Sequence, residues 1–156
     1  MAVYTSATSK VYVGGVATGS ENQAAYEAKS WVEIGEISNI GVFGDAASEI
    51  NFTAVSDRRV RKFKGSFNAG NLVLEFGLDQ DDAGQDVLRT AQASDSDYCF
   101  RVDLNDNNAA SPTDVTKYYF NGKVMDAPVT IGTAENITMG GCTIGINTAI
   151  IQVSRA

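Results

Sequence analysis

The chain has 156 residues, of which 44% are hydrophobic and 20% charged, with 15 Gly, 2 Pro and a formal net charge of −7. This length predicts one domain over residues 1–156 with a core of useful size. A pI near 4.5 argues against a nucleic-acid-binding module, which is normally basic. Neither a leader peptide pattern nor a run of about twenty apolar residues occurs, so we expect no membrane partner.

Histidine is absent from the chain. Its absence removes the usual general base, the Ser-His-Asp and Cys-His pairs and most zinc ligand sets. We therefore expect no enzyme, no cofactor and no metal. Paired carboxylates of the glycosidase type stay open as an alternative, because such groups meet only in the folded chain.

Alternation of apolar and polar residues recurs along most of the chain and predicts a mainly β protein. Residues 1–9 precede the first such segment and are expected to form a flexible N-terminal arm. The predicted strands are Lys10 to Val16, Trp31 to Ile40, Glu49 to Val55, Val60 to Phe67, Leu72 to Leu78, Tyr98 to Leu104, Lys117 to Met125 and Ile137 to Val153. The last is either two strands or one strand bent at Gly140-Gly141 or Gly145.

Two segments lack periodicity and are predicted as loops, Thr18 to Ala28 and Asn105 to Asp114. The connection from Phe67 to Leu72 has the Asn and Gly residues of a hairpin turn.

The most basic segment is Asp57 to Gly65, which holds five of the twelve Lys and Arg residues. It lies between two alternating segments, so it is predicted to connect two strands. In an acidic chain such a run favours another copy of the same protein as its partner. A solvated loop without a partner is the alternative.

One helix is predicted from Ala83 to about Ala93. Asp82 is its expected N-cap, and Gln85 three residues later suggests a variant of the capping box. The segment that begins at Asp79 also resembles the start of a calcium loop. Ala83 and Thr90 occupy two of the required ligand positions, so the capping interpretation is favoured. Asp103 to Asp114 is a second candidate for a weak ion site, in which Asn108 replaces the expected Gly and Asp114 the bidentate Glu.

The two cysteines are predicted to remain unbonded within the chain. Cys99 alternates with the residues expected in the core and projects with Arg101 and Asp103, whereas Cys142 is in step with Ile144 and Ile146. A bond between subunits remains open. The expected fold is a β-sandwich or partly open β-barrel with one flanking helix.

Several segments, taken in chain order, resemble the tail tube proteins of tailed bacteriophages. They are Trp31 to Ile37, Ile50 to Thr53, the charged run Asp57 to Lys64, Lys64 to Ser66, Asn68 to Leu72, Asp79 to Gln85, Tyr119 to Val124 and the long segment from Asn136. The resemblance covers about residues 28 to 153 and depends on the order and spacing of these motifs.

The resemblance implies hexameric rings with a shared inner β-barrel, stacked into a hollow tube that delivers genomic DNA. Expected partners are other copies of the chain, tail initiator or baseplate and terminator proteins, a sheath protein if the tail is contractile, and DNA that passes without specific binding. The expected location is the virion tail, after assembly in the host cytoplasm.

Within this framework the basic run is expected to contact the adjoining ring, with the N-terminal arm and Gly41 to Ser48 as secondary candidates. The inter-ring candidates are Arg58, Arg59, Arg61, Lys62, Lys64 and Asp45. An acidic lumen would repel phosphates and let DNA pass. The candidates for that lining are Glu33, Glu49, Glu75 and Asp103.

Two alternatives stay open. The first is the tube of a related bacterial secretion or gene-transfer apparatus. The second is a monomeric β-sandwich that binds a ligand, for which Trp31 and the tyrosines would supply an aromatic platform. Aromatic residues at alternating strand positions are more often part of the core.

Overall fold

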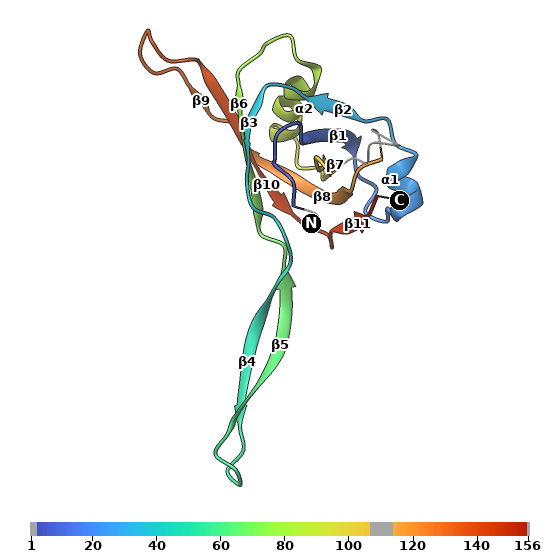
Figure 1. The fold of residues 1–156 in the computed structure, drawn as a ribbon, viewed down its shortest axis with the longest axis vertical. Helices are drawn as coiled ribbons and strands as arrows, with labels where there is room; N and C mark the ends of the chain where they lie inside the picture. Colours follow the sequence, from blue (N-terminus) through green and yellow to red (C-terminus); the bar gives the residue numbers. More distant parts are fainter. Residues whose placement is uncertain (1–2, 107–113, 156) are drawn as a thin grey trace.

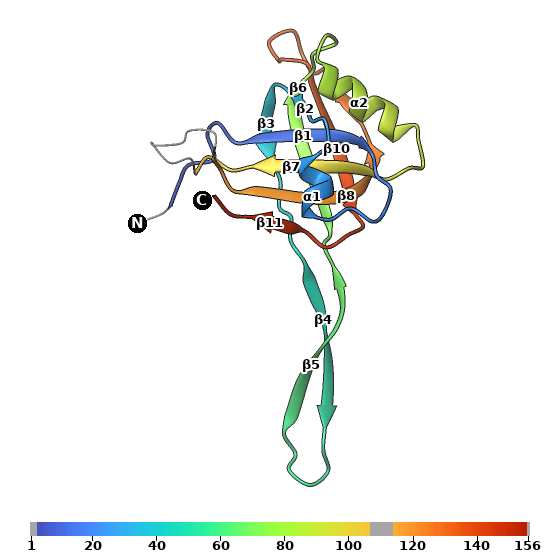
Figure 2. The same ribbon diagram turned by 90° about the vertical axis from the view of Figure 1, so that its right-hand side faces the viewer.

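The computed structural model of the chain describes residues 3–106 and 114–155. It consists of antiparallel β-structure with two short helices, and one long hairpin extends away from the body (Figures 1 and 2). The elements are β1 (Lys10–Val16), α1 (Gln23–Glu27), β2 (Val32–Ile34), β3 (Ile37–Ile40), β4 (Ala46–Thr53), β5 (Val60–Asn68), β6 (Asn71–Gly77), α2 (Ala83–Gln92), β7 (Tyr98–Asp103), β8 (Lys117–Asp126), β9 (Val129–Thr130), β10 (Met139–Ile146) and β11 (Ile151–Val153). Neither helix is long and apolar enough to cross a membrane.

In the described part of the chain, nine strands form one antiparallel sheet in the order β2-β1-β7-β8-β10-β6-β3, with β11 beside β8 and β9 beside β10. Strand β8 joins its two parts, because its first half pairs with β7 and its second half, from Gly122, pairs with β10. The strands β1, β7 and β8 run across the direction of β3, β6 and β10 (Figure 2). The sheet thus curls around its own apolar face.

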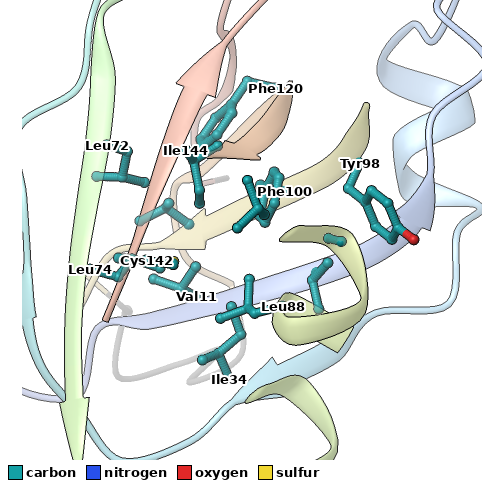
Figure 3. Close-up of a cluster of buried hydrophobic side chains, with 14 of the residues drawn as sticks. Val11, Ile34, Leu72, Leu74, Leu88, Tyr98, Phe100, Phe120, Cys142 and Ile144 are labelled. Carbon is teal, nitrogen blue, oxygen red and sulfur yellow. The ribbon is translucent and has the colours of Figure 1, made fainter. Parts of the chain in front are cut away.

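The main core lies inside this curl (Figure 3). Alternation places one side of β6 in it, with Leu72 and Leu74 fully buried while Val73 and Glu75 are exposed. Helix α2 covers one end through Leu88 and Ala91. Side chains from strands in both parts of the sheet complete the core; they include Val11, Phe100, Phe120 and Ile144.

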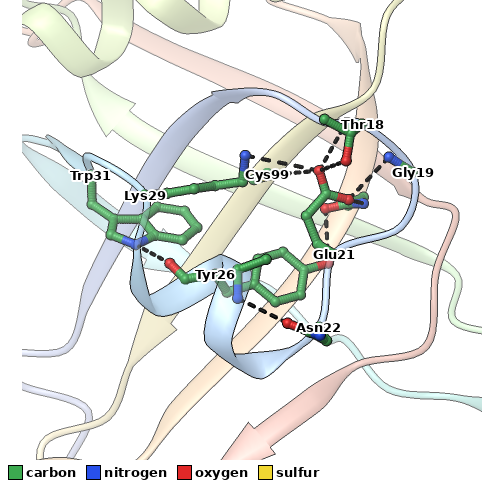
Figure 4. A network of polar contacts seen from close by, with 10 residues as sticks. Thr18, Gly19, Glu21, Asn22, Tyr26, Lys29, Trp31 and Cys99 are labelled. Atoms are coloured by element: carbon green, nitrogen blue, oxygen red, sulfur yellow. Dashed lines mark hydrogen bonds and ion pairs between the residues drawn. The ribbon is translucent and has the colours of Figure 1, made fainter.

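A second, smaller cluster lies on the outer face of β7 and β8, where α1 covers Cys99 and Tyr119. Tyr26 of α1 stacks on Tyr119, and its hydroxyl donates a hydrogen bond to Asn121 Oδ1 at 2.8 Å. Glu21 lies beside these residues (Figure 4) and accepts hydrogen bonds from the Thr18 hydroxyl at 2.9 Å and from Asn121 Nδ2 at 2.9 Å. A polar network therefore fixes the α1 segment to the sheet.

Helix α2 begins as predicted, because the Asp82 side chain accepts a hydrogen bond from the Gln85 amide at 2.9 Å. The reciprocal half of the predicted capping box is wrong. The Gln85 side chain accepts from the Asp79 amide instead and donates to the carbonyls of Gly35 and Gly77. It therefore joins the helix to two strands.

Two predicted strands are each divided. Residues 31–40 form β2 and β3, because the chain turns at Glu36, where φ is +59°, and changes its partner from β1 to β6. The final segment forms two strands, β10 and β11, which confirms the first of the two alternatives, and the break between them lies at residues 147–150. Strand β9 was not predicted.

The loop predicted from Thr18 to Ala28 contains helix α1, so the expectation of a single helix is wrong. Asn22 caps it by accepting a hydrogen bond from the Ala25 amide at 2.9 Å. The hairpin predicted from Phe67 to Leu72 is also wrong, because β5 and β6 follow one another and do not pair. The predicted loop and ion site near Asn105 extend into residues 107–113, outside the described residues.

Both cysteines are free, as predicted, and both are buried. Cys99 belongs to the outer cluster and Cys142 to the main core. Burial raises the pKa of Cys99 to about 11 and that of Cys142 to about 12.

Candidate assembly surface

Strands β4 and β5 form a hairpin that we call the arm, Ala46–Asn68. Figures 1 and 2 show it extending from one end of the body. Every residue of β4 is exposed, and so is every residue of β5 except Gly65. Two glycines with positive φ, Gly44 at +149° and Gly70 at +76°, flank its base, where the strands leave the curled sheet.

The pairing register gives the arm two chemically different faces. Residues directly opposite one another in an antiparallel pair share a face. Ile50 therefore shares a face with Phe63, and Phe52, two residues from Ile50, shares it with Arg61. The opposite face carries the polar pairs Glu49 with Lys64 and Asn51 with Lys62.

The apolar face of the arm is not covered by the rest of the subunit. Ile50, Phe52 and Phe63 are between 53% and 56% exposed. A two-stranded hairpin without packing on one face is at best marginally stable in water, and clustered exposed apolar side chains mark interaction surfaces. The arm therefore has the composition of a surface that another molecule covers.

Charge is separated between the arm and the body. The arm carries five basic and two acidic residues, whereas the rest of the sequence carries seven basic and seventeen acidic residues. Arg61 pairs with Asp57 at 2.5 Å and Lys62 with Glu49 at 3.6 Å. Within the described residues the other three basic side chains of the arm form no ion pair: Arg58, Arg59 and Lys64.

The structure brings the five basic candidates together on this one protrusion. Arg58 and Arg59 lie in the turn between the strands, and Arg58 has a φ of +54°. Arg61, Lys62 and Lys64 lie on β5 itself. Asp45 directly precedes the arm at its base, where it lines a groove of about 580 Å³ with Phe67.

The four acidic candidates do not share one surface. Glu33 on β2 lies 3.9 Å from Lys10, and Glu49 is on the arm. Asp103 on β7 is only 9% exposed and lies 2.9 Å from Arg101, with its pKa raised by burial against the opposing effect of Arg101. Glu75 on β6 is exposed and has no ion pair within the described residues.

Sequence reasoning missed the uncovered apolar face. Its signal, apolar residues at alternate positions of the two strands, is the same signal that a core strand gives. A second exposed hairpin was also missed, between β9 and β10, where all residues from 128 to 137 are exposed.

A curled antiparallel sheet with a long arm whose apolar face is uncovered is typical of a subunit that another molecule covers. The family model described as "Phage tail tube protein, TTP" matches residues 2–138, so the chain belongs to the phage tail tube protein family. It is a structural protein that forms the tail tube of the virion, not an enzyme. No curated protein sequence matches the chain.

Solved structures share this fold. A chain in the structure of the PVC sheath/tube terminator of an extracellular contractile injection system has a TM-score of 0.70 at 13% identity over 97% of each chain. A chain of the anti-feeding prophage baseplate has a TM-score of 0.69 at 13% identity, covering 99% of this chain and 97% of that one. The SPP1 tail tube gives 0.66 at 11% identity, covering 94% and 77%. At these identities the likeness concerns the fold.

Proposed function

We propose that the chain forms hexameric rings that stack into a hollow conduit for DNA. The proposal is based on the exposure of the arm, whose apolar face is not covered by the rest of its own subunit. A second copy supplies cover of the right kind because the arm is basic and the remaining surface is acidic.

In this proposal, neighbouring copies within a ring join through unpaired strand edges. Strand β3 lies at the end of the sheet and, among the residues that the structure describes, pairs with β6 alone, so its other edge is open. A groove of about 310 Å³ follows this edge between Ile37–Ile40 and Ser6–Ser9. A strand from the neighbouring copy would pair with this edge, and a closed ring would leave no open edge to aggregate.

The passage of DNA is assigned to an anionic bore. Outside the arm, acidic residues exceed basic ones by ten. Such a surface repels phosphates and prevents the counterion-releasing contacts that hold DNA in place. Glu75 is the sequence candidate that is both exposed and unpaired within the described residues, and it lies on β6, next to the open-edged strand β3.

The ends of the tube define the remaining partners. A stack built from unlike surfaces has a different surface at each end. Initiator or baseplate proteins and terminator proteins would bind these ends, and a sheath would bind the outer wall if the tail is contractile. Similar folds occur in baseplate, sheath-tube and terminator assemblies.

Negative-stain microscopy together with native mass spectrometry tests the proposal. The purified chain should form rings of six copies, and tubes at higher concentration. A variant in which a two-residue turn replaces the arm should remain folded by circular dichroism and form no tubes. Stable monomers of the intact chain at high concentration would contradict the proposal and favour the ligand-binding alternative.

A further inference from the structure

A second exposed hairpin lies at the end of the body opposite the arm (Figure 1). It connects β9 to β10, and its side chains include Val129, Ile131 and Ile137, the last of which is 78% exposed. An open groove of about 390 Å³ runs along it, lined by Ile131, Ile137, Met139 and Glu135 among others. We call this segment, residues 126–139, the distal hairpin.

The distal hairpin is complementary to the arm in both chemistry and charge. Its large exposed side chains, Val129, Ile131 and Ile137, are apolar, like those on one face of the arm. It contains two acidic residues, Asp126 and Glu135, and no basic residue. Within the described residues neither carboxylate forms an ion pair, and Arg58 and Arg59 at the tip of the arm are likewise unpaired.

The positions of the arm and the distal hairpin on the subunit also suit contact between stacked copies. Contact between two different surfaces at opposite ends of a molecule generates an open head-to-tail stack. The arm and the distal hairpin occupy such ends (Figure 1). Contact between two arms, in contrast, would bring like charges together.

Building on the proposed function, we infer that the arm of one copy docks on the distal hairpin of a copy in the adjoining ring. The face with Ile50, Phe52 and Phe63 lies against the groove beside Ile131, and the arginines at the tip approach Glu135. The specified partner is therefore a second copy of this chain.

Cysteine crosslinking in assembled tubes tests this contact. The variant carries Phe52→Cys and Ile131→Cys, and the native cysteines remain because both are buried. If the arm reaches the next ring, mild oxidation links copies along the tube, and a non-reducing denaturing gel shows a ladder that continues beyond the hexamer. A control with Phe52→Cys and Gln23→Cys, the latter at an exposed position of α1, should give no ladder.

The outcomes separate this inference from the proposed function. A ladder that ends at the hexamer would place the contact within one ring. The absence of crosslinks in intact tubes would mean that the arm contacts another surface. Either result would overturn the inference but would leave the proposed tube function intact. Failure of the unmodified chain to form tubes would instead overturn the proposed function.

Charge exchange is the second measurement. Glu135→Arg should lower the ring-to-ring association constant by up to about fivefold, the scale of one surface ion pair. Adding Arg59→Glu in the same chain should restore it. The matched control is Glu27→Arg, on exposed α1, which should leave association unchanged. Equal effects of Glu135→Arg and Glu27→Arg, or no recovery in the double variant, would contradict the docking site.

Discussion

The carboxylate of Glu21 accepts a hydrogen bond from Asn121 Nδ2 at 2.9 Å, which joins the segment before α1 to the middle of β8. The Glu21 side chain is only 2% exposed. Burial raises its pKa, but hydrogen bonds from Thr18 and Asn121 outweigh this effect and lower the pKa to about 2. Folding therefore favours the ionised form.

This relationship predicts a pH dependence of stability. Because the folded-state pKa is below the unfolded value of 4.5, the stabilisation is complete above that value and is lost as the pH falls towards about 2. Glu21→Gln should cost about 1–3 kcal/mol at pH 7 and flatten the stability curve below pH 4.5. Urea unfolding at several pH values measures this, with Glu27→Gln on the exposed face of α1 as the control. An unchanged curve in the Glu21 variant would contradict the assignment.

Reversal of charge at the tip of the arm should impair stacking without unfolding the subunit. The variant Arg58→Glu with Arg59→Glu leaves the Asp57–Arg61 pair intact. Both residues lie in an exposed turn, so the unfolding free energy should change by no more than about 0.5 kcal/mol. Tube length by microscopy should fall, whereas Arg89→Glu on α2 should leave it unchanged. Tubes of normal length would show that the tip of the arm does not take part in ring stacking.

The strands of the arm could be predicted because alternation marks a strand wherever one face differs from the other. The same pattern does not say what covers the apolar face, since that depends on molecules outside the chain. Ile50 and Leu72 give equivalent signals in sequence, yet only Leu72 is buried in the subunit. The alternation of Cys99 and Cys142 did predict their separation, because it depends only on local strand geometry.

The elements that were missed depend on contacts distant in sequence. Helix α1 is too short for a periodic pattern and is held by its cap and by Tyr26 against the sheet. The break at Glu36 arises because β2 and β3 join different neighbours. Nothing local to residues 31–40 specifies that change of partner.

Substitutions on the arm and in the core should therefore have opposite consequences. Phe63→Ser should change the unfolding free energy of the monomer by about 0.5 kcal/mol or less and abolish tube formation, because Phe63 is exposed in the subunit. Leu72→Ala should cost about 2–5 kcal/mol. Chemical denaturation and microscopy distinguish the two effects. A large loss of monomer stability in the Phe63 variant would mean that its own subunit covers the arm.

The thiols should be unreactive in the folded chain. Burial raises the pKa of Cys99 to about 11, with smaller effects of Lys29, which lowers it, and of Glu21, which raises it; burial raises the pKa of Cys142 to about 12. Because the thiolate is the reactive form, a thiol reagent at pH 8 should label neither residue at an appreciable rate. In denaturant without reductant, two thiols per chain should react. Fewer than two would reveal a bond between subunits.

Gly84 allows the close contact between α2 and β2. A Cβ atom at this position would lie 2.3 Å from the Glu33 carbonyl oxygen and 2.7 Å from Ile34 Cα, both backbone atoms that cannot rotate away. Alanine normally stabilises a helix by about 1 kcal/mol relative to glycine, but here the helix would have to move off the sheet. Gly84→Ala should therefore destabilise the subunit by about 1–3 kcal/mol. Thermal unfolding measures the effect against Thr90→Ala on the exposed side of α2, and a stabilised Gly84 variant would show that this contact can relax.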